Sequence, residues 1–240
     1  MRYLEPDWPA PSNVRALTTT RVGGVSHGRF SSWNLGMHVG DAPDDVAKNR
    51  LLLAKQVEGD ITWLDQVHGT QVVHLPSEDP HPEADAAFAE TTGQVCTIMT
   101  ADCLPVLFCS DDGQQVAAAH AGWRGLLNGV LESTLSMFEA PSRCLVWLGP
   151  AIGPQAFEVG EDVYQAFTTL SPEAKVAFMP TDSHKYFADL YMLATQRLQQ
   201  AGVTAVYGGE FCTYQQADQF YSYRRDGQTG RMATCIWRVK

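Results

Sequence analysis

Hydrophobic and polar positions along the chain follow two different periods. Short apolar runs bounded by Gly, Asp or Pro are typical of buried strands, and apolar residues spaced three or four apart are typical of helices. The first pattern predicts strands at residues 14–20, 71–75, 95–99, 105–109, 115–121 and 144–149, with later strands at 204–209 and 232–237. The second predicts helices at residues 46–56, 126–138, 161–170 and 189–202. Asp44 or Asp45 is the expected N-cap of the first helix, and Gly202 fits the end of the last.

These elements interleave without strict strand–helix alternation, which favours an α/β (α+β) fold over a doubly wound parallel sheet. The expected architecture is a mixed sheet or a pair of sheets with helices packed outside. The pattern contains no linker, internal repeat or low-complexity tract. We therefore expect one catalytic domain that spans residues 1–240.

Charge and composition narrow the class of protein. The chain has 240 residues, 45% of them hydrophobic, and its 17 basic and 27 acidic residues give a net charge of -10. This balance argues against nucleic acid as a partner and, more weakly, against binding to anionic membranes. No apolar run reaches the length of a membrane span. The first residues, "MRYLEPDWPAPSNV", contain no apolar h-region, so we expect no secretory signal. The six cysteines are scattered without a C-x-x-C pair, so we expect reduced thiols and a cytoplasmic location.

Reactive side chains interrupt two of the most apolar runs. Asp102 and Cys103 break the run "TADCLPVLF", and His120 and Arg124 lie at the end of "AAAHAGWRG". Burying an unpaired polar group costs roughly 2–7 kcal/mol, so these groups need partners. Together with His68 in "DQVHGT" they offer imidazole and thiolate donors that suit Zn²⁺. Three protein ligands, His68, Cys103 and His120, would leave the open fourth position of a catalytic zinc site.

The same residues allow other interpretations. Cys103 can be a buried apolar residue, with both histidines hydrogen-bonded in structural roles. Two histidines and a cysteine can also hold mononuclear copper, but no clear axial methionine accompanies them: Met99 is the nearest candidate, and its place in "VCTIM" is typical of the core. A multicopper oxidase needs several paired histidines, and the seven histidines include no H-x-H pair. Cys103 can also be a nucleophile with His120 as its base, and Asp102 or another polar group would then orient the histidine. The spacing alone does not separate these mechanisms.

Further polar residues are candidates for binding substrate. Arg21 and Arg124 follow strand-like segments and suit bidentate binding of a phosphate, with a surface ion pair as the alternative. Asn34, Arg50 and Gln66 lie near apolar turns and suit a ribose or a base, or else cap turns. Asp102 is a candidate to orient a ligand or a bound water, or to accept bonds from nearby backbone N–H groups.

Several motifs resemble those of the YfiH-type family. They are "TTTRVGGVS", "WNLGMHVGD", "NR", "WLDQVHGTQV", "ADA", "TADCLPVLF", "AAAHAGWRG", "WLGPAIGP" and "FYSYRRDGQTGRM", in order from about residue 12 to the C-terminus. Members of this family have been called laccase-domain polyphenol oxidase, purine nucleoside phosphorylase and peptidoglycan editing factor. The resemblance implies a central β-sandwich with helices outside, similar to a deamidating-toxin domain with a Cys–His pair. It also implies a zinc site formed by His68, Cys103 and His120.

The resemblance also implies an activity. The first hypothesis is a zinc-dependent enzyme that phosphorolyses adenosine, inosine, guanosine and methylthioadenosine and deaminates adenosine. The alternative is a cytosolic amidase or hydrolase that removes a wrongly incorporated amino acid from a peptidoglycan precursor, UDP-MurNAc-amino acid. A copper polyphenol oxidase is less favoured because the seven histidines include no H-x-H pair. In each reading the partner is a small molecule.

Overall fold

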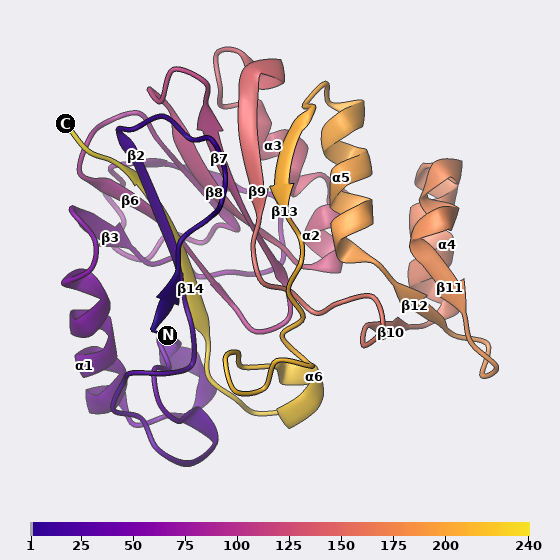
Figure 1. Cartoon of the computed structure of the whole chain (residues 1–240), viewed down its shortest axis with the longest axis horizontal. Helices are drawn as coiled ribbons and strands as arrows, with labels where there is room; N and C mark the ends of the chain where they lie inside the picture. Colours follow the sequence, from indigo (N-terminus) through magenta and orange to yellow (C-terminus); the bar gives the residue numbers. More distant parts are fainter. Residues whose placement is uncertain (1) are drawn as a thin grey trace.

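Two large mixed sheets form the centre of the molecule (Figure 1). The computed structural model describes residues 2–240. One sheet has the order β1 (Tyr3–Leu4), β2 (Val14–Thr19), β14 (Met232–Arg238), β6 (Gln94–Thr100) and β3 (Asp60–Thr62). The other has the order β13 (Ala205–Gly208), β9 (Cys144–Leu148), β7 (Leu104–Ser110), β8 (Val116–Ala121), β5 (Ala86–Ala89) and β4 (Val72–Leu75). The β3–β6, β4–β5 and β13–β9 pairs are parallel and the other pairs are antiparallel, so both sheets are mixed as predicted.

The two sheets pack face to face and enclose a common core. Ile98 and Ile236 from the first sheet lie in one buried cluster with Leu107, Ala118 and Trp147 from the second. Strands β7 and β8 are buried on both faces, which explains why their sequences are apolar without alternation. The arrangement is the predicted β-sandwich.

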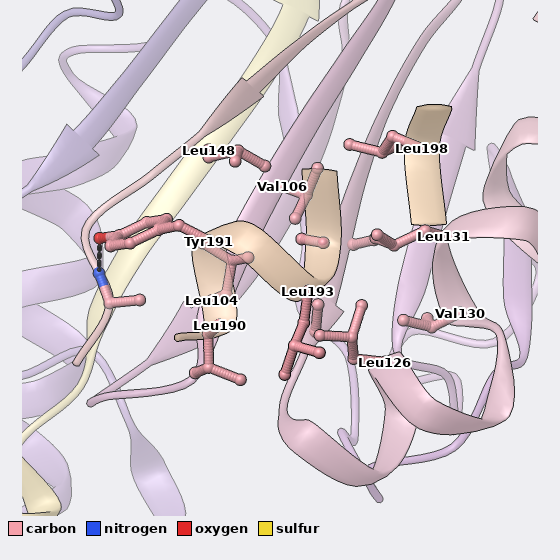
Figure 2. Packing of buried hydrophobic residues seen from close by; sticks show 14 of the residues in the cluster. Leu104, Val106, Leu126, Val130, Leu131, Leu148, Leu190, Tyr191, Leu193 and Leu198 are labelled. Carbon is pink, nitrogen blue, oxygen red and sulfur yellow. Dashed lines mark hydrogen bonds between the residues drawn. The ribbon is translucent and has the colours of Figure 1, made fainter. Parts of the chain in front are cut away.

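Helices cover the outer face of each sheet. The helices α2 (Trp123–Asn128), α3 (Val130–Leu135) and α5 (Leu190–Gln200) pack on the six-stranded sheet, where Leu126, Leu131 and Leu193 share a buried cluster with Val106 and Leu148 (Figure 2). The helix α1 (Pro43–Ala54) lies over the five-stranded sheet. Within residues 2–240 no helix combines the length and the apolar character that a membrane span requires.

Shorter elements complete the chain. A three-stranded sheet of β10 (Glu158–Val159), β12 (Tyr186–Ala188) and β11 (Phe178–Pro180) lies with α4 (Glu161–Leu170) at one side of the molecule (Figure 1). The 3-10 helices are η1 (Gly28–Phe30), η2 (Met37–Val39), η3 (Pro141–Arg143) and η4 (Pro172–Ala177), and α6 spans Tyr223–Asp226. The hydroxyl of Tyr191 on α5 accepts a hydrogen bond of 2.8 Å from the backbone N–H of Ala151, which ties α5 to the loop after β9 (Figure 2).

Two helix predictions are wrong in detail. The first helix begins at Pro43 with Ala42 as its N-cap, because proline is well suited to the first helical position, and Asp44 and Asp45 lie in its first turn instead. The helix predicted over residues 126–138 is two helices, because Gly129 adopts a φ of 99° between α2 and α3. The short strands β1, β3, β5, β10, β11 and β12 were not predicted, since runs of two to four residues carry little periodicity.

The break at Gly129 gives a stability prediction. Gly129→Ala places a Cβ on a backbone with φ of 99°, and the atoms that it would meet are no nearer than 3.5 Å. The cost is therefore backbone strain, which we expect to be about 1–2 kcal/mol. Urea unfolding should show that loss for Gly129→Ala and almost none for Ser133→Ala on α3, and equal stability of the two variants would contradict the strain argument.

Candidate active site

Three donor side chains meet at one end of the sandwich. The ligand atoms of His68, Cys103 and His120 all lie within 4.8 Å of one another, and Cys103 Sγ is 3.8 Å from His68 Nε2. Because Leu104 pairs with Ala121 and Pro105 with His120 across β7 and β8, Cys103 just before β7 is carried to the end of β8. Gly122 leaves the space for this approach: a Cβ there would lie 2.8 Å from His68 Cδ2 and 3.1 Å from Cys103 Sγ.

The backbone is strained at two points beside these donors. His68 has a φ of 61° and Asp102 a φ of 88°, in the left-handed region that few non-glycine residues adopt. Such strain persists only where surrounding contacts hold it. For Asp102 those contacts are visible, because its carboxylate accepts 2.6 Å hydrogen bonds from the Thr213 hydroxyl and from the Arg224 backbone N–H. The carboxylate thus connects the turn that carries Cys103 to two later loops.

Asp85 holds both histidines, although the sequence analysis did not select it. Its fully buried carboxylate accepts hydrogen bonds from the backbone N–H groups of Val67 (3.1 Å), His68 (3.0 Å) and Gly69 (2.5 Å). The His120 Nδ1 lies 2.7 Å from Asp85 Oδ1. The sequence feature that could have identified Asp85 is a charged residue inside the apolar run "EADAAFA", the same kind of feature that identified Asp102 as a candidate.

The protonation states of Cys103, His120 and Asp85 depend on one another. Burial alone would raise the pKa of the Cys103 thiol, but the charge on His120 and hydrogen bonds from His120 and His68 lower the pKa to about 6. Burial alone would lower the pKa of His120, but the Cys103 thiolate and Asp85 raise the pKa to about 9. Burial also opposes ionisation of Asp85, yet its hydrogen bond with His120 and the backbone N–H groups keep its pKa below the usual value. The thiolate is therefore the form that these contacts favour, as a metal ligand or a nucleophile requires.

A cavity of about 550 Å³ opens onto the three donors. Six of the residues selected from the sequence line it: Gln66, His68, Asp102, Cys103, His120 and Arg124. The amide of Gln66 bonds to both the N–H and the carbonyl of Met99, so it braces β6 as well as facing the cavity. The exposed guanidinium of Arg124 lies 4.4 Å from the ring centroid of Trp123.

Three predicted substrate-binding residues do not line this cavity. Arg21 donates to the carbonyls of Ser31 and Ala217 and lies over the ring of Tyr221. Arg50 stacks at 3.8 Å on Trp63 and donates to Leu35, and burial lowers its pKa to about 10.

Asn34, the third of them, is fully buried, and its amide bonds to Asp41, Gly36 and the Arg231 backbone. Contact with substrate stays a prediction for Arg21, Arg50 and Asn34, while their observed contacts are with the protein itself.

The cavity wall adds further charged groups, of which Asp65 and Arg231 were not among the candidates from the sequence. Asp65 and Arg231 line it, and so does Arg224. Within residues 2–240, no carboxylate lies in salt-bridge distance of Arg124, Arg224 or Arg231. The signal for Arg231 was an arginine directly before the apolar strand that starts at Met232.

The fold and the site together define a mixed β-sandwich protein with a His–Cys–His group that can hold a metal at the wall of a substrate-sized cavity. The chain belongs to the family described as "Multi-copper polyphenol oxidoreductase laccase", whose model matches residues 15–239.

Curated relatives and solved structures agree with this membership. The purine nucleoside phosphorylase YfiH of Escherichia coli is 51% identical over 242 residues, which cover 99% of each chain. A purine nucleoside phosphorylase of Pseudomonas aeruginosa is 54% identical over 98% of each chain. The crystal structure of the Neisseria meningitidis protein NMB0706 superposes with a TM-score of 0.97 at 51% identity and full coverage of both chains. YlmD from Geobacillus stearothermophilus superposes with a TM-score of 0.94 at 31% identity, over 100% of this chain and 97% of that one.

Proposed function

We propose that this protein is a zinc-dependent purine nucleoside phosphorylase that also deaminates adenosine. Its substrates are adenosine, inosine, guanosine and methylthioadenosine. The observation that carries the proposal is the group of His68, Cys103 and His120 at the wall of the 550 Å³ cavity. A cavity of that size is within the range of small-molecule sites. The names of the relatives at 51% and 54% identity support the choice of substrate.

The donor set fits zinc. Asp85 engages His120 Nδ1, which leaves Nε2 of that ring as the nitrogen for a metal, in the carboxylate–histidine arrangement common to zinc sites. A cysteine and two histidines suit Zn²⁺, and when bound it would supply Lewis-acid polarisation of the substrate. Copper is the metal that the family description names, but a multicopper oxidase needs several groups of ligands. Among residues 2–240 only one group of three or more His, Cys, Asp or Glu donors is close enough to hold an ion.

Different residues of the cavity have different functions in phosphorolysis. A phosphate oxygen attacks C1′ of the ribose while the bond from C1′ to the purine nitrogen breaks, which yields ribose 1-phosphate and the free base. Cationic side chains of the cavity, Arg124 and Arg231 among them, balance the charge of the phosphate. Trp123 and Phe157 provide apolar walls for the base and the sugar. In deamination water attacks C6 of adenosine in place of any attack at C1′, and ammonia leaves from the same carbon to give inosine.

The partner is thus a small molecule and neither a nucleic acid nor a membrane, in keeping with the net charge of -10. We place the reaction in the cytoplasm. All six cysteines are free thiols, and this is the state that a reducing compartment maintains.

A second candidate function rests on a separate observation. Asp85, His120 and Cys103 stand in the order of orienting group, base and nucleophile, with 2.7 Å between Asp85 Oδ1 and His120 Nδ1. In an amidase the Cys103 sulfur would attack the amide carbon, His120 would protonate the departing amine, and water would hydrolyse the thioester. The substrate would then be the UDP-MurNAc-amino acid precursor.

One assay separates the two functions. Zinc-loaded protein is incubated with each nucleoside, with and without phosphate, and with the muramyl precursor, and free base, ammonia and amino acid are measured. We expect base from inosine only when phosphate is present, and ammonia from adenosine without it. Release of amino acid from the precursor, with no base from any nucleoside, would replace the proposal by the amidase.

A further inference from the structure

We propose that Arg231 is the residue that grips a phosphate oxyanion in this cavity, and that the loop of Asn34 and Gly36 positions it. The proposal rests on the proposed function for its substrate, but the binding site itself is argued from the contacts of these residues. The sequence pattern predicted Arg124 and Arg21 as the residues that bind phosphate. The contacts around these two arginines support that function less well than the contacts around Arg231 do.

Arg231 presents one free edge of its guanidinium. Its Nη1 donates to the backbone carbonyls of Thr229 (3.0 Å) and Gly230 (3.1 Å), which fixes one side of the planar group. Within residues 2–240, Nε and Nη2 have no hydrogen-bond partner and no carboxylate is in salt-bridge distance. A half-buried arginine held in this way keeps unused donors ready for the two oxygens of an anion.

The backbone and stem of Arg231 are held by the loop before η2. Asn34 Oδ1 accepts the backbone N–H of Arg231 at 2.9 Å and also that of Gly36, and the carbonyl of Arg231 accepts the N–H of Leu35. Gly36 lies against the stem, since a Cβ there would be 2.9 Å from Arg231 Cγ and 3.3 Å from Arg231 Cβ. Asn34 is thereby a positioning residue, which accounts for its full burial away from the cavity wall.

The other arginines of the cavity are less suited to the task. Arg124 is exposed and lies over Trp123, so water competes for it, and no partner among residues 2–240 fixes its guanidinium by a hydrogen bond. Nη1 of Arg224 already donates a hydrogen bond to the carbonyl of Glu158, and the guanidinium lies over the ring of Phe157. Arg21 has two backbone carbonyls as partners and does not line the cavity. The negative charges near Arg231 are the Cys103 thiolate and Asp102, and Asp65 also lines the cavity. Both oxygens of Asp102 already accept hydrogen bonds, and a metal held by Cys103 would offset the charge of the thiolate.

A phosphate oxyanion in this cavity has two sources. It is inorganic phosphate if the protein is a phosphorylase, and the diphosphate of a sugar nucleotide if the protein acts on a muramyl precursor. Binding of the two probes, inorganic phosphate and UDP, is therefore measured by isothermal titration calorimetry on zinc-loaded protein. The variants are Arg231→Lys and Arg124→Lys, with Arg143→Lys as a matched control on the exposed Arg143–Asp111 pair, neither residue of which lines the cavity.

Arg231→Lys keeps the charge but removes the planar fork, so we expect affinity for phosphate to fall about tenfold to a hundredfold. Arg124→Lys should weaken it by less than about threefold, as for an exposed charge, and Arg143→Lys should not change it. Loss in Arg124→Lys with none in Arg231→Lys would overturn the proposal, as would a wild-type protein that binds neither probe. Binding of UDP through Arg231, with no binding of inorganic phosphate, would keep the anion site and reject the phosphorylase.

A second variant tests the positioning role. Gly36→Ala must displace the stem of Arg231, and the φ of -86° at Gly36 is one that alanine adopts without strain. We expect the KM for phosphate to rise about tenfold while the melting temperature changes little and the KM for nucleoside stays within about twofold. If the melting temperature falls and both KM values rise together, Gly36 serves only the fold, and the positioning part of the proposal is wrong.

Discussion

Asp85→Asn is expected to lose most of its zinc and several kcal/mol of stability. The two carboxylate oxygens of Asp85 accept four hydrogen bonds, with His68 and His120 on Oδ1 and Val67 and Gly69 on Oδ2. An amide offers one oxygen and one NH₂ group, so two of these donors would face a donor whichever way the side chain turns. Each buried group left unpaired costs about 1–3 kcal/mol, which gives about 2–6 kcal/mol in total.

The effect on the metal follows from the same contacts. Asp85 sets the backbone of the loop that carries His68 and fixes the ring of His120, so its loss disturbs two of the three donors at once. Partners of metal-binding histidines are typically worth tenfold to a hundredfold in metal affinity. Zinc per chain after gel filtration and the midpoint of urea unfolding measure the two effects, with Asp44→Asn on the exposed side of α1 as control. Full zinc together with wild-type stability in Asp85→Asn would contradict the assigned role.

The large elements were predictable because their cores are regular. Strands β6, β7 and β8 are long, apolar and bounded by turn residues, and α5 has its apolar face at helical spacing, an Asp189 N-cap and Gly202 after its end. The small sheet of β10–β12 was not predictable, because its strands have two or three residues and their pairing depends on contacts distant in sequence. The split at Gly129 shows the limit of periodicity, since a helical pattern continues through a residue that breaks the helix.

The site was predictable to different degrees for its different residues. His68, Cys103 and His120 carry reactive groups at the ends of apolar runs, and the structure brings them together. Asp85 and Arg231 contribute through contacts between residues distant in sequence, which no local pattern encodes. Asp85 accepts a hydrogen bond from a loop 16 residues before it, and Arg231 is held by a loop almost 200 residues away. Asn34 shows the reverse case, a polar residue whose partners proved to be in the protein itself.

Cys103→Ala is expected to remove the metal and both proposed activities. Zinc should fall from about one per chain to nearly none, because two histidines hold the ion far less firmly than three donors. Phosphorolysis and deamination should each fall at least about a hundredfold. Cys103 is only half-buried, so the fold should lose no more than about 1 kcal/mol. Elemental analysis and nucleoside turnover test the assignment, and a variant that keeps full zinc would reject Cys103 as a ligand.

Alkylation then distinguishes a metal ligand from a nucleophile. In zinc-loaded protein Cys103 should react slowly with iodoacetamide, and removal of zinc by a chelator should make it the fastest of the six cysteines. The internal comparison comes from Cys96, Cys109, Cys144 and Cys235, which are buried with raised pKa values. Mass spectrometry of the labelled peptides gives the order of reaction. Rapid labelling of Cys103 in the zinc-loaded protein, or an acyl adduct on its sulfur after exposure to the muramyl precursor, would favour the amidase, because a thiol that binds zinc is shielded from both reactions.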